Sequence, residues 1–352
     1  MKNILKKLTK ISLIILPIGV LLLIIGLCSG GKFNYAIDMN NKKMYVAEEG
    51  EHTSVSKTLE VDAFNELEMD IDVAEVEIKQ GDDYCVSYNL EKWSVPTVEV
   101  KDQKLTVSNA DKQTTHIGFQ FDVFGFHIGP QVWDDEGNKI TITVPEDVEL
   151  NDLKLIVSSG NISIEKIQIA DYSIEAESGE VILSNTELGK GSIFAKYGNV
   201  EFKQVEGKKC LLNMESGSGA FEDVKLEQLD LNAEYGNVEF DKTEILTLMI
   251  ENSSGEVRLN QFKGDTMDIV AEYGNISIDE TTAANLKLIC ESGETNVKLI
   301  GNLEDYNLDI EVESGDLEIN GEEQGEKVNR ETGKSKSVTI ANEYGNVDLE
   351  IR

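Results

Sequence analysis

Carboxylates are the side chains of this sequence whose spacing could support chemistry. Glutamate recurs two residues before glycine in a repeated turn, and aspartate or glutamate often follows that glycine directly. Carboxylate oxygens bind Ca²⁺ and other divalent cations, and stacked turns would arrange them as acidic ladders. The weak metal-ligand candidates in these ladders are Glu234, Glu272 and Glu291.

The acidic ladders do not require a bound metal. Two like charges about 5 Å apart in water repel each other by only about 1 kcal/mol, so solvated ladders are tolerable. The Gly-Gly-x-Gly-x-Asp nonapeptide of calcium-loaded β-rolls does not occur in the sequence. We therefore expect solvated acids, with weak binding of divalent cations as the alternative.

Residues that commonly carry catalysis are scarce. Histidine occurs only at positions 52, 116 and 127, and the sequence lacks the Gly-x-Ser-x-Gly, His-Glu-x-x-His and P-loop motifs. Arginine, which β-helix enzymes that cleave acidic polysaccharides place on a groove, occurs only at 258, 330 and 352. We predict no catalytic residue, no cofactor and no enzymatic activity, and a β-helix enzyme acting on polysaccharide is the least favoured alternative.

The charge and the cysteines exclude further classes of function. Lys and Arg number 32 against 66 Asp and Glu, a net charge of −34, which repels nucleic acid and anionic lipid. Cys28, Cys85, Cys210 and Cys290 contain no Cys-x-x-Cys pair. We interpret them as free thiols, mostly buried, rather than as a disulfide framework or a zinc site.

A glycine that recurs every 19 residues organises the second half of the chain. The glycines at this interval are Gly160, Gly179, Gly198, Gly217, Gly236, Gly255, Gly274 and Gly293. Gly315 and Gly345 follow at intervals of 22 and 30, as expected if loops were inserted into later coils. Ser or Tyr precedes each glycine and a short apolar alternation follows it, which predicts a turn and then a strand.

Three apolar columns accompany the glycines. Seven positions before the glycine stand Leu153, Tyr172, Cys210, Leu229, Leu248, Met267 and Leu286, with Gly191 as the small exception. Five positions before it stand Leu155, Ile174, Ile193, Leu212, Leu231, Ile250, Ile269 and Leu288. Four positions after it stand Ile164, Leu183, Phe202, Phe221, Phe240, Leu259, Ile278 and Val297. These columns define one continuous core.

A repeat of this length cannot bury its own apolar face, so neighbouring units must stack. We predict an all-β chain whose repeats form a β-solenoid, a right-handed parallel β-helix with about 19 residues per coil. About ten coils spaced by about 4.8 Å would make a rod about 50 Å long.

Two details of the repeated turn have more than one interpretation. Tyr197, Tyr235 and Tyr273 alternate with serines, which indicates a unit of two coils. A large ring beside a small hydroxyl would let stacked corners interdigitate, and a tyrosine-lined ligand stripe is the alternative. Asparagine directly after the glycine, as at Asn199, is interpreted as a residue that tolerates a left-handed turn.

Residues 11–31 form an apolar stretch long enough to span a bilayer. Lysines precede this stretch and acids dominate after it, so the positive-inside rule predicts a single-pass cell-membrane protein with a cytoplasmic N-terminus and an extracellular remainder. A cleaved signal peptide is the main alternative. The predicted organisation is, in order, a cytoplasmic tail (1–10), a transmembrane anchor (11–31), a tether (32–58), an N-terminal β region with an aromatic insertion (59–150) and the solenoid repeats (151–352).

The aromatic insertion concentrates Phe119, Phe121, Phe124 and Phe126 around Gly125. We interpret it as a hairpin that plugs the membrane-proximal end of the solenoid, because open sheet ends must be capped. The alternative is a loop that binds a partner or touches the membrane, for which the four phenylalanines are the candidate residues.

The run ITITVPEDVEL at 140–150, leading into SSGNISI and the later Ser-Gly and Tyr-Gly repeats, resembles the bacterial adhesin-like family of β-strand-repeat proteins, which has no assigned function. The resemblance covers about residues 59–352, and the sequence departs from it by the aromatic insertion. It implies a surface protein labelled as an adhesin, and for some members an accessory role near envelope-stress regulators.

The sequence therefore favours a membrane-anchored, extracytoplasmic β-solenoid that serves as a binding, adhesion-like or scaffold module. Its expected partners are the membrane, through residues 11–31, and a protein or cell-wall glycan. An accessory protein in envelope-stress signalling is the alternative.

Overall fold

The computed structural model describes residues 54–92, 94–109 and 137–352 in full, together with the backbone of a few short strands outside these ranges. The chain divides into two compact units. The first comprises Met1–Thr53 and Gln113–Asp135, and the second comprises Ser54–Lys112 and Glu136–Arg352.

The described strands of the first unit form two small antiparallel sheets. β1 (Tyr35–Asp38) pairs with β2 (Lys43–Val46) and with β9 (His116–Ile117). β10 (Phe121–Val123) and β11 (Phe126–Ile128) pair as a hairpin, as the aromatic insertion predicted. The stretch predicted as a tether therefore contains β1 and β2.

From β13 onward, each coil of the second unit consists of a long strand, a glycine turn and a short strand. β15 (Gln168–Ser178), for example, is followed by the turn at Gly179 and then by β16 (Val181–Ser184). The other long strands are β13 (Glu149–Ser159), β17 (Glu187–Tyr197), β19 (Glu206–Ser216), β21 (Lys225–Tyr235), β23 (Glu244–Ser254) and β25 (Lys263–Tyr273). The other short strands are β14 (Ile162–Glu165), β18 (Val200–Lys203), β20 (Gly219–Glu222), β22 (Val238–Asp241) and β24 (Val257–Asn260).

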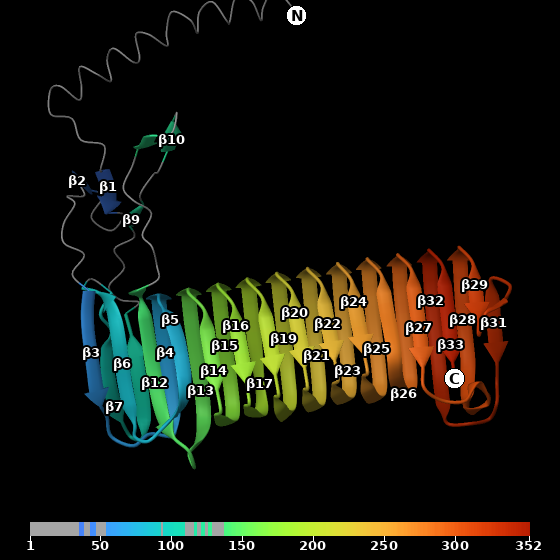
Figure 1. Cartoon of the computed structure of the whole chain (residues 1–352), viewed down its shortest axis with the longest axis horizontal. Coiled ribbons are helices and arrows are strands. Elements are labelled where there is room, and N and C mark those ends of the chain that lie inside the picture. The colour runs from blue at the N-terminus through green and yellow to red at the C-terminus, as the bar shows by residue number, and fades with distance from the viewer. Residues whose placement is uncertain are drawn as a thin grey trace, which may run out of the picture. The chain divides into compact units, whose positions relative to one another are not determined.

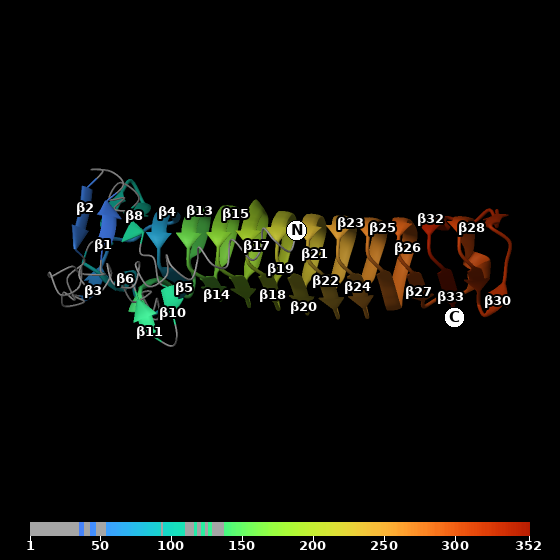
Figure 2. The same cartoon turned by 90° about the horizontal axis from the view of Figure 1, so that it is seen from above.

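Successive coils pair in parallel and in register, so that each residue lies beside the residue 19 positions further on. Ile174 pairs with Ile193 in the long-strand sheet, and Leu183 pairs with Phe202 in the short-strand sheet. Figure 1 shows the strands side by side along the second unit, and Figure 2 shows the long and short strands as two rows. The predicted all-β solenoid and its 19-residue coil are confirmed.

The three predicted columns form the core between the two sheets. Every member is buried except Gly191. The side chain of Tyr172, one coil away, occupies the space where Gly191 has no side chain, and its hydroxyl donates to the carbonyl of Lys209. Further along, the rings of Phe221 and Phe240 stack with centroids 4.5 Å apart, an arrangement that adds to the apolar burial.

The glycine of each turn is required by both conformation and space. At Gly236 φ is +142°, a conformation that L side chains rarely adopt, and a Cβ there would overlap the carbonyl oxygen of Gly217 in the neighbouring coil. The same overlap recurs along the row of turn glycines. Close backbone stacking at this edge therefore explains the 19-residue glycine period.

The asparagines after these glycines have a different role from the one predicted. Asn237 is not in the left-handed region; its Oδ1 accepts a hydrogen bond from the backbone N–H of Glu256 in the next coil, at 2.9 Å. The left-handed residues lie six positions after the glycine, at the other turn, where Lys242 has a φ of +51°. The hydrogen bonds to asparagine Oδ1 recur on alternate coils, so the structural unit is two coils.

The N-terminal end of the solenoid departs from chain order. β4 (Glu66–Val73) and β5 (Glu75–Gly81) form a coil that lies between β13–β14 on one side and β8 (Lys104–Ser108) and β12 (Lys139–Pro145) on the other. Antiparallel strands then finish both sheets: β7 (Thr97–Lys101) pairs with β8, β6 (Cys85–Glu91) with β12, and β3 (Ser54–Glu60) with β6.

The C-terminal end repeats this device. The last coil, formed by β32 (Lys336–Tyr344) and β33 (Val347–Ile351), is inserted between the coil of β26 (Ile276–Ser292) and β27 (Thr295–Leu299) and the coil of β28 (Tyr306–Ser314) and β29 (Leu317–Ile319). The single turn of 3₁₀ helix η3 (Leu303–Asp305) precedes β28. Antiparallel β30 (Glu322–Glu323) and β31 (Lys327–Arg330) finish the sheets.

Two sequence-based boundaries change in light of this topology. The solenoid does not begin at residue 151, because β4, β5, β8 and β12 continue both of its sheets. β3 begins at Ser54, inside the predicted tether. The described residues contain no helix of the length and apolarity needed to cross a membrane, and the predicted anchor at 11–31 lies outside them.

Candidate functional site

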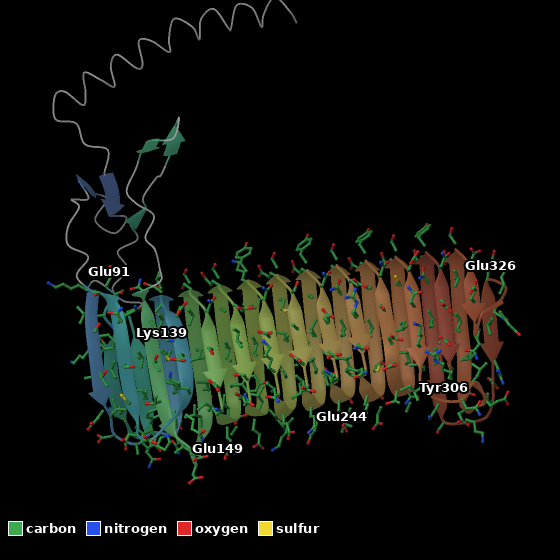
Figure 3. The ribbon with its side chains drawn as sticks, in the orientation of Figure 1. Glu91, Lys139, Glu149, Glu244, Tyr306 and Glu326 are labelled. Atoms are coloured by element: carbon green, nitrogen blue, oxygen red, sulfur yellow. The ribbon has the colours of Figure 1, made fainter. Side chains whose placement is uncertain are left out.

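A row of exposed tyrosines follows the edge of the solenoid at which the long strands end. We call Tyr197, Tyr235, Tyr273 and Tyr344 the tyrosine row. Their side chains are 58%, 63%, 63% and 62% exposed, the highest values among the large apolar side chains that the structure describes. Figure 3 shows side chains projecting at intervals beyond this edge, while Glu149 and Glu244, which begin β13 and β23, mark the opposite edge.

Strand pairing places a serine between successive tyrosines. Ser216 pairs with Tyr197 and Tyr235, and Ser254 pairs with Tyr235 and Tyr273. Neighbouring tyrosines are therefore two coils apart, about 10 Å at the usual strand spacing. The predicted alternation is present, and the rings extend into solvent instead of packing into the coil.

The fourth tyrosine joins the row through the inserted C-terminal coil. Tyr344 lies 71 positions after Tyr273 in the sequence, since 344 − 273 = 71. In the sheet it pairs with Ser292 on one side and Ser314 on the other. The alternation of tyrosine and serine therefore continues across a break in chain order.

A shallow depression opens on the long-strand sheet beside Tyr235, over β21, β23 and β25. Its lining consists of Asn232, Glu234, Tyr235, Glu251, Asn252, Ser253, Val270 and Glu272. The depression exists because Ser253, a small residue, occupies the position that glutamate holds in the coils on either side. An aromatic ring, carboxylates and an amide thus border one open surface, a combination that can stack on a ligand and accept or donate hydrogen bonds.

Charge along the row is uneven. The ammonium group of Lys196 lies 5.6 Å from the centroid of the Tyr197 ring, within the range of a cation–π contact. Glutamate instead precedes the other three tyrosines, at Glu234, Glu272 and Glu343. The edge beyond Tyr197 therefore combines exposed rings with negative charge.

Two of the three weak metal candidates border this depression. Glu234 and Glu272 lie on either side of it, and Glu291 follows in the next coil. All three residues are exposed. Across the part of the chain that the structure describes, no group of three or more His, Cys, Asp or Glu side chains is placed to hold a metal ion.

The other sequence-based candidates are elsewhere in the chain. Phe121 and Phe126 belong to the β10–β11 hairpin, whereas Phe119 and Phe124 lie outside the described residues. Sequence reasoning missed Tyr344 as a member of the row and missed Ser253. The signal for Tyr344 was the Tyr-Gly-Asn triplet at 344–346, which the three earlier tyrosines share.

The described cysteines are free, as predicted. Cys85 is half-buried, and Cys210 and Cys290 are buried. Burial raises the pKa of the Cys210 thiol to about 12, against a smaller opposing effect of its hydrogen bond with Tyr172. Such a thiol stays protonated at neutral pH and is a poor nucleophile.

Comparison with known proteins identifies a matching family. The model of the family described as Toastrack DUF4097 matches residues 64–222 and 198–350. No curated protein matches the chain significantly.

Similar solved structures include proteins named putative adhesin from Bacteroides fragilis and from Parabacteroides distasonis. They are 14% and 13% identical to this chain, with TM-scores of 0.39 and 0.35, and the alignments cover 68% and 69% of this chain and 96% and 98% of theirs. A protein named putative lipid binding protein from Parabacteroides distasonis is 15% identical, with a TM-score of 0.37, over 84% of this chain and 98% of its own. From residue 64 to residue 350, covered by the two family matches, this chain belongs to the Toastrack DUF4097 family.

Proposed function

We propose that this chain is an extracytoplasmic binding module, held at the membrane by residues 11–31, and that the tyrosine row is its contact surface. The row carries the proposal because exposed aromatic rings recur there at a fixed spacing. A solenoid presents such repeated side chains as an extended, rigid surface. The apolar face and polar hydroxyl of tyrosine make it a frequent contact residue at interfaces.

The repeated turn does not itself need tyrosine. At Ser159 a serine precedes the turn glycine, and Asn161 still accepts the inter-coil hydrogen bond from the N–H of Glu180 at 2.9 Å. Asn199, in a turn that begins with Tyr197, makes the same bond to Ser218. Since the turn forms equally well with serine, the tyrosines need a reason other than turn geometry.

Exposure of the rings indicates a role at the surface. A tyrosine that packed the corners together would lose most of its accessible area, yet each member of the row keeps more than half of it. Large apolar side chains aligned on one edge of a soluble domain are typical of an interaction site. Preorganisation on rigid strands reduces the entropy lost when a ligand binds.

The test replaces the row with the residue that the solenoid already uses at Ser159. The full-length protein would carry Tyr197→Ser, Tyr235→Ser, Tyr273→Ser and Tyr344→Ser, and its retention on sedimented cell-wall sacculi would be measured. We expect the wild type to sediment with the walls and the variant to stay in the supernatant. Equal unfolding temperatures of the two proteins would show that the fold is intact.

A matched control changes the same number of exposed apolar side chains elsewhere. Leu211, Leu246, Met249 and Ile300 are 39%, 44%, 46% and 53% exposed and lie outside the row. Changing these four residues to serine should leave retention on the walls unchanged. Equal losses of retention in both variants would show general stickiness and would contradict the proposal.

The orientation across the membrane has a separate test. Protease added to intact cells that produce the full-length chain should degrade residues 54–352 and leave a cytoplasmic reporter uncut. A solenoid protected in intact cells and cleaved only after lysis would contradict the extracytoplasmic placement.

A further inference from the structure

We propose that the tyrosine row binds an extended, uncharged β-1,4-linked polysaccharide, with one tyrosine under every second sugar. This inference rests on the proposed function, in which the row is the contact surface. It adds the chemical class of the ligand and the register in which that ligand lies.

The spacing of the rings carries the inference. Two coils separate neighbouring tyrosines, a distance of about 10 Å, which is also the length of two sugars in an extended β-1,4-linked chain. Adjacent sugars of such a chain turn opposite faces to one side, so alternate sugars present the same face. A ring on every second coil therefore meets an equivalent sugar face each time.

The residues between the rings fit the intervening sugars. Ser216, Ser254 and Ser292 pair with the tyrosines on both sides and leave space between the rings. A sugar whose substituents point toward the protein would occupy that space, while its neighbours stack their C–H faces on tyrosine. A run of adjacent tyrosines would fill it.

The depression beside Tyr235 supplies polar contacts. Glu234 and Glu272 can accept hydrogen bonds from sugar hydroxyls, and Asn232 can accept or donate them. The same carboxylates, on a chain with a net charge of −34, repel anionic polymers. These charges favour an uncharged glycan over an acidic one.

The inserted C-terminal coil extends the register. Tyr344 lies two coils beyond Tyr273, with Ser292 between them. Although Ser314 comes before Tyr344 in the sequence, Tyr344 takes the place next to Ser292, so the two-coil interval is kept. The four rings therefore span three equal intervals, about 30 Å, which is the length of six sugars, so an extended chain needs at least seven sugars to stack on all four rings.

Calorimetric titration of the full-length protein with fully N-acetylated, uncharged chito-oligosaccharides of two, four, six and eight sugars tests the inference. We expect the affinity to rise with each added pair of sugars until the row is spanned, by up to about tenfold per ring engaged. Malto-oligosaccharides of equal length, which are α-1,4-linked and coil, should show no such rise. Equal binding of the two series would overturn the inference.

A second variant tests the register while it keeps the number of rings. The double change Tyr273→Ser and Ser254→Tyr places two tyrosines one coil apart and leaves three coils before Tyr344. We expect this variant to bind eight sugars about tenfold more weakly than the wild type. An unchanged affinity would contradict the two-sugar register.

The outcomes also separate this inference from the proposed function. If cell walls retain the wild type and not the row variant, but no chito-oligosaccharide binds with length dependence, the contact surface stands and the glycan class is wrong. If the walls retain neither protein and no oligosaccharide binds, both proposals fail.

Discussion

The middle of the solenoid and its two ends are built from the same coil in different orders. From β13 to β27, chain order and spatial order coincide, and each coil pairs with the next. At each end one coil is enclosed by two others: β4–β5 lies between β8–β12 and β13–β14, and β32–β33 lies between β26–β27 and β28–β29. The ends therefore combine sequence-distant segments, whereas the middle combines adjacent ones.

The difference shows how a parallel stack can end. A parallel coil leaves unpaired backbone N–H and C=O groups at each exposed edge, which invites pairing with another chain. Here antiparallel strands finish the edges: β3 and β7 at one end, and β30 and β31 at the other. Placing the first and last parallel coils inside the stack holds each end by long-range pairing in addition to local turns.

The largest expected effect is a disulfide cross-link that forms only if the C-terminal coils stack in their spatial order and not in chain order. Asn285 pairs with Ser337, and Ser337 pairs with Asn307. Adjacent strands bring their Cα atoms to about 5 Å, within disulfide range, whereas strands two positions apart lie about 10 Å from each other. We expect Asn285→Cys with Ser337→Cys to cross-link almost completely under mild oxidation, as measured by a mobility shift on denaturing gels.

The matched pair for this experiment follows chain order instead. Asn285→Cys with Asn307→Cys should stay uncross-linked, because the inserted coil separates them. Efficient cross-linking of this second pair, with none in the first, would show that the C-terminal coils stack in chain order.

The next largest effect compares two glycines. Gly236→Ala in the middle should lower the free energy of unfolding by about 4 kcal/mol or more, because it combines a φ of +142° with overlap on the carbonyl of Gly217. Gly321→Ala in the turn between β29 and β30 should cost about 1 kcal/mol, since φ there is +75° and nothing lies within 4 Å of the added Cβ. Urea unfolding measures both, and equal costs would contradict the spatial account of the glycine row.

The sequence predicted the middle of the solenoid well because there the signal is periodic. Glycine spacing and three apolar columns specify which residues face inward, and every column member except Gly191 is buried. The exception became clear only in three dimensions, since Tyr172 reaches into a space left by a residue 19 positions away. A pattern can identify a small residue without indicating which side chain fills the gap.

The ends and the candidate site could not be predicted in the same way. The order in which parallel coils stack depends on which sheet edges pair, and these edges are alike from coil to coil. The local sequence motif around Gly315 and Gly345 would be the same in either stacking order of the last two coils. The unequal intervals of 22 and 30 indicated inserted loops, which are the η3 turn and the β30–β31 strands, but not the exchange of coils. The Tyr-Gly-Asn triplet could identify Tyr344 as a turn tyrosine, but its position directly after Ser292 in the row follows only from the exchange of coils.

A smaller effect is expected for the inter-coil asparagine hydrogen bond, which should stabilise the middle of the solenoid and its C-terminal end equally. Asn237 Oδ1 accepts from the N–H of Glu256 in the middle, and Asn346 Oδ1 accepts from the N–H of Asp316 across the reordered end, at 2.9 and 3.0 Å. We expect Asn237→Ala and Asn346→Ala each to lower the free energy of unfolding by about 1 kcal/mol. Asn213→Ala, at an exposed position on the long-strand sheet, should change it little. A loss confined to Asn237→Ala would show that the C-terminal end unfolds separately.

The smallest effect concerns an ion pair that joins the reordered coils at the N-terminal end. The carboxylate of Glu68 in β4 bonds to Lys104 in β8 and to Lys154 in β13. The hydrogen bond from Lys104 holds the pKa of Glu68 below its usual value of 4.5, against a smaller raising effect of burial and with further help from Lys154. Because the folded chain has the lower pKa, this contribution is present above the unfolded value and is lost as the pH falls through the folded one.

Glu68→Gln should therefore lower the free energy of unfolding by about 0.5 kcal/mol at neutral pH, as expected for an exposed pair. The difference from the wild type should shrink as the pH falls through the lowered pKa of the folded chain, and disappear once the carboxyl is protonated in both states. Urea unfolding of both proteins at neutral pH and at a pH low enough to protonate this carboxyl in both states measures this change. A difference that persisted at the lower pH would mean that Glu68 supports the β8–β4–β13 order by packing and not by charge.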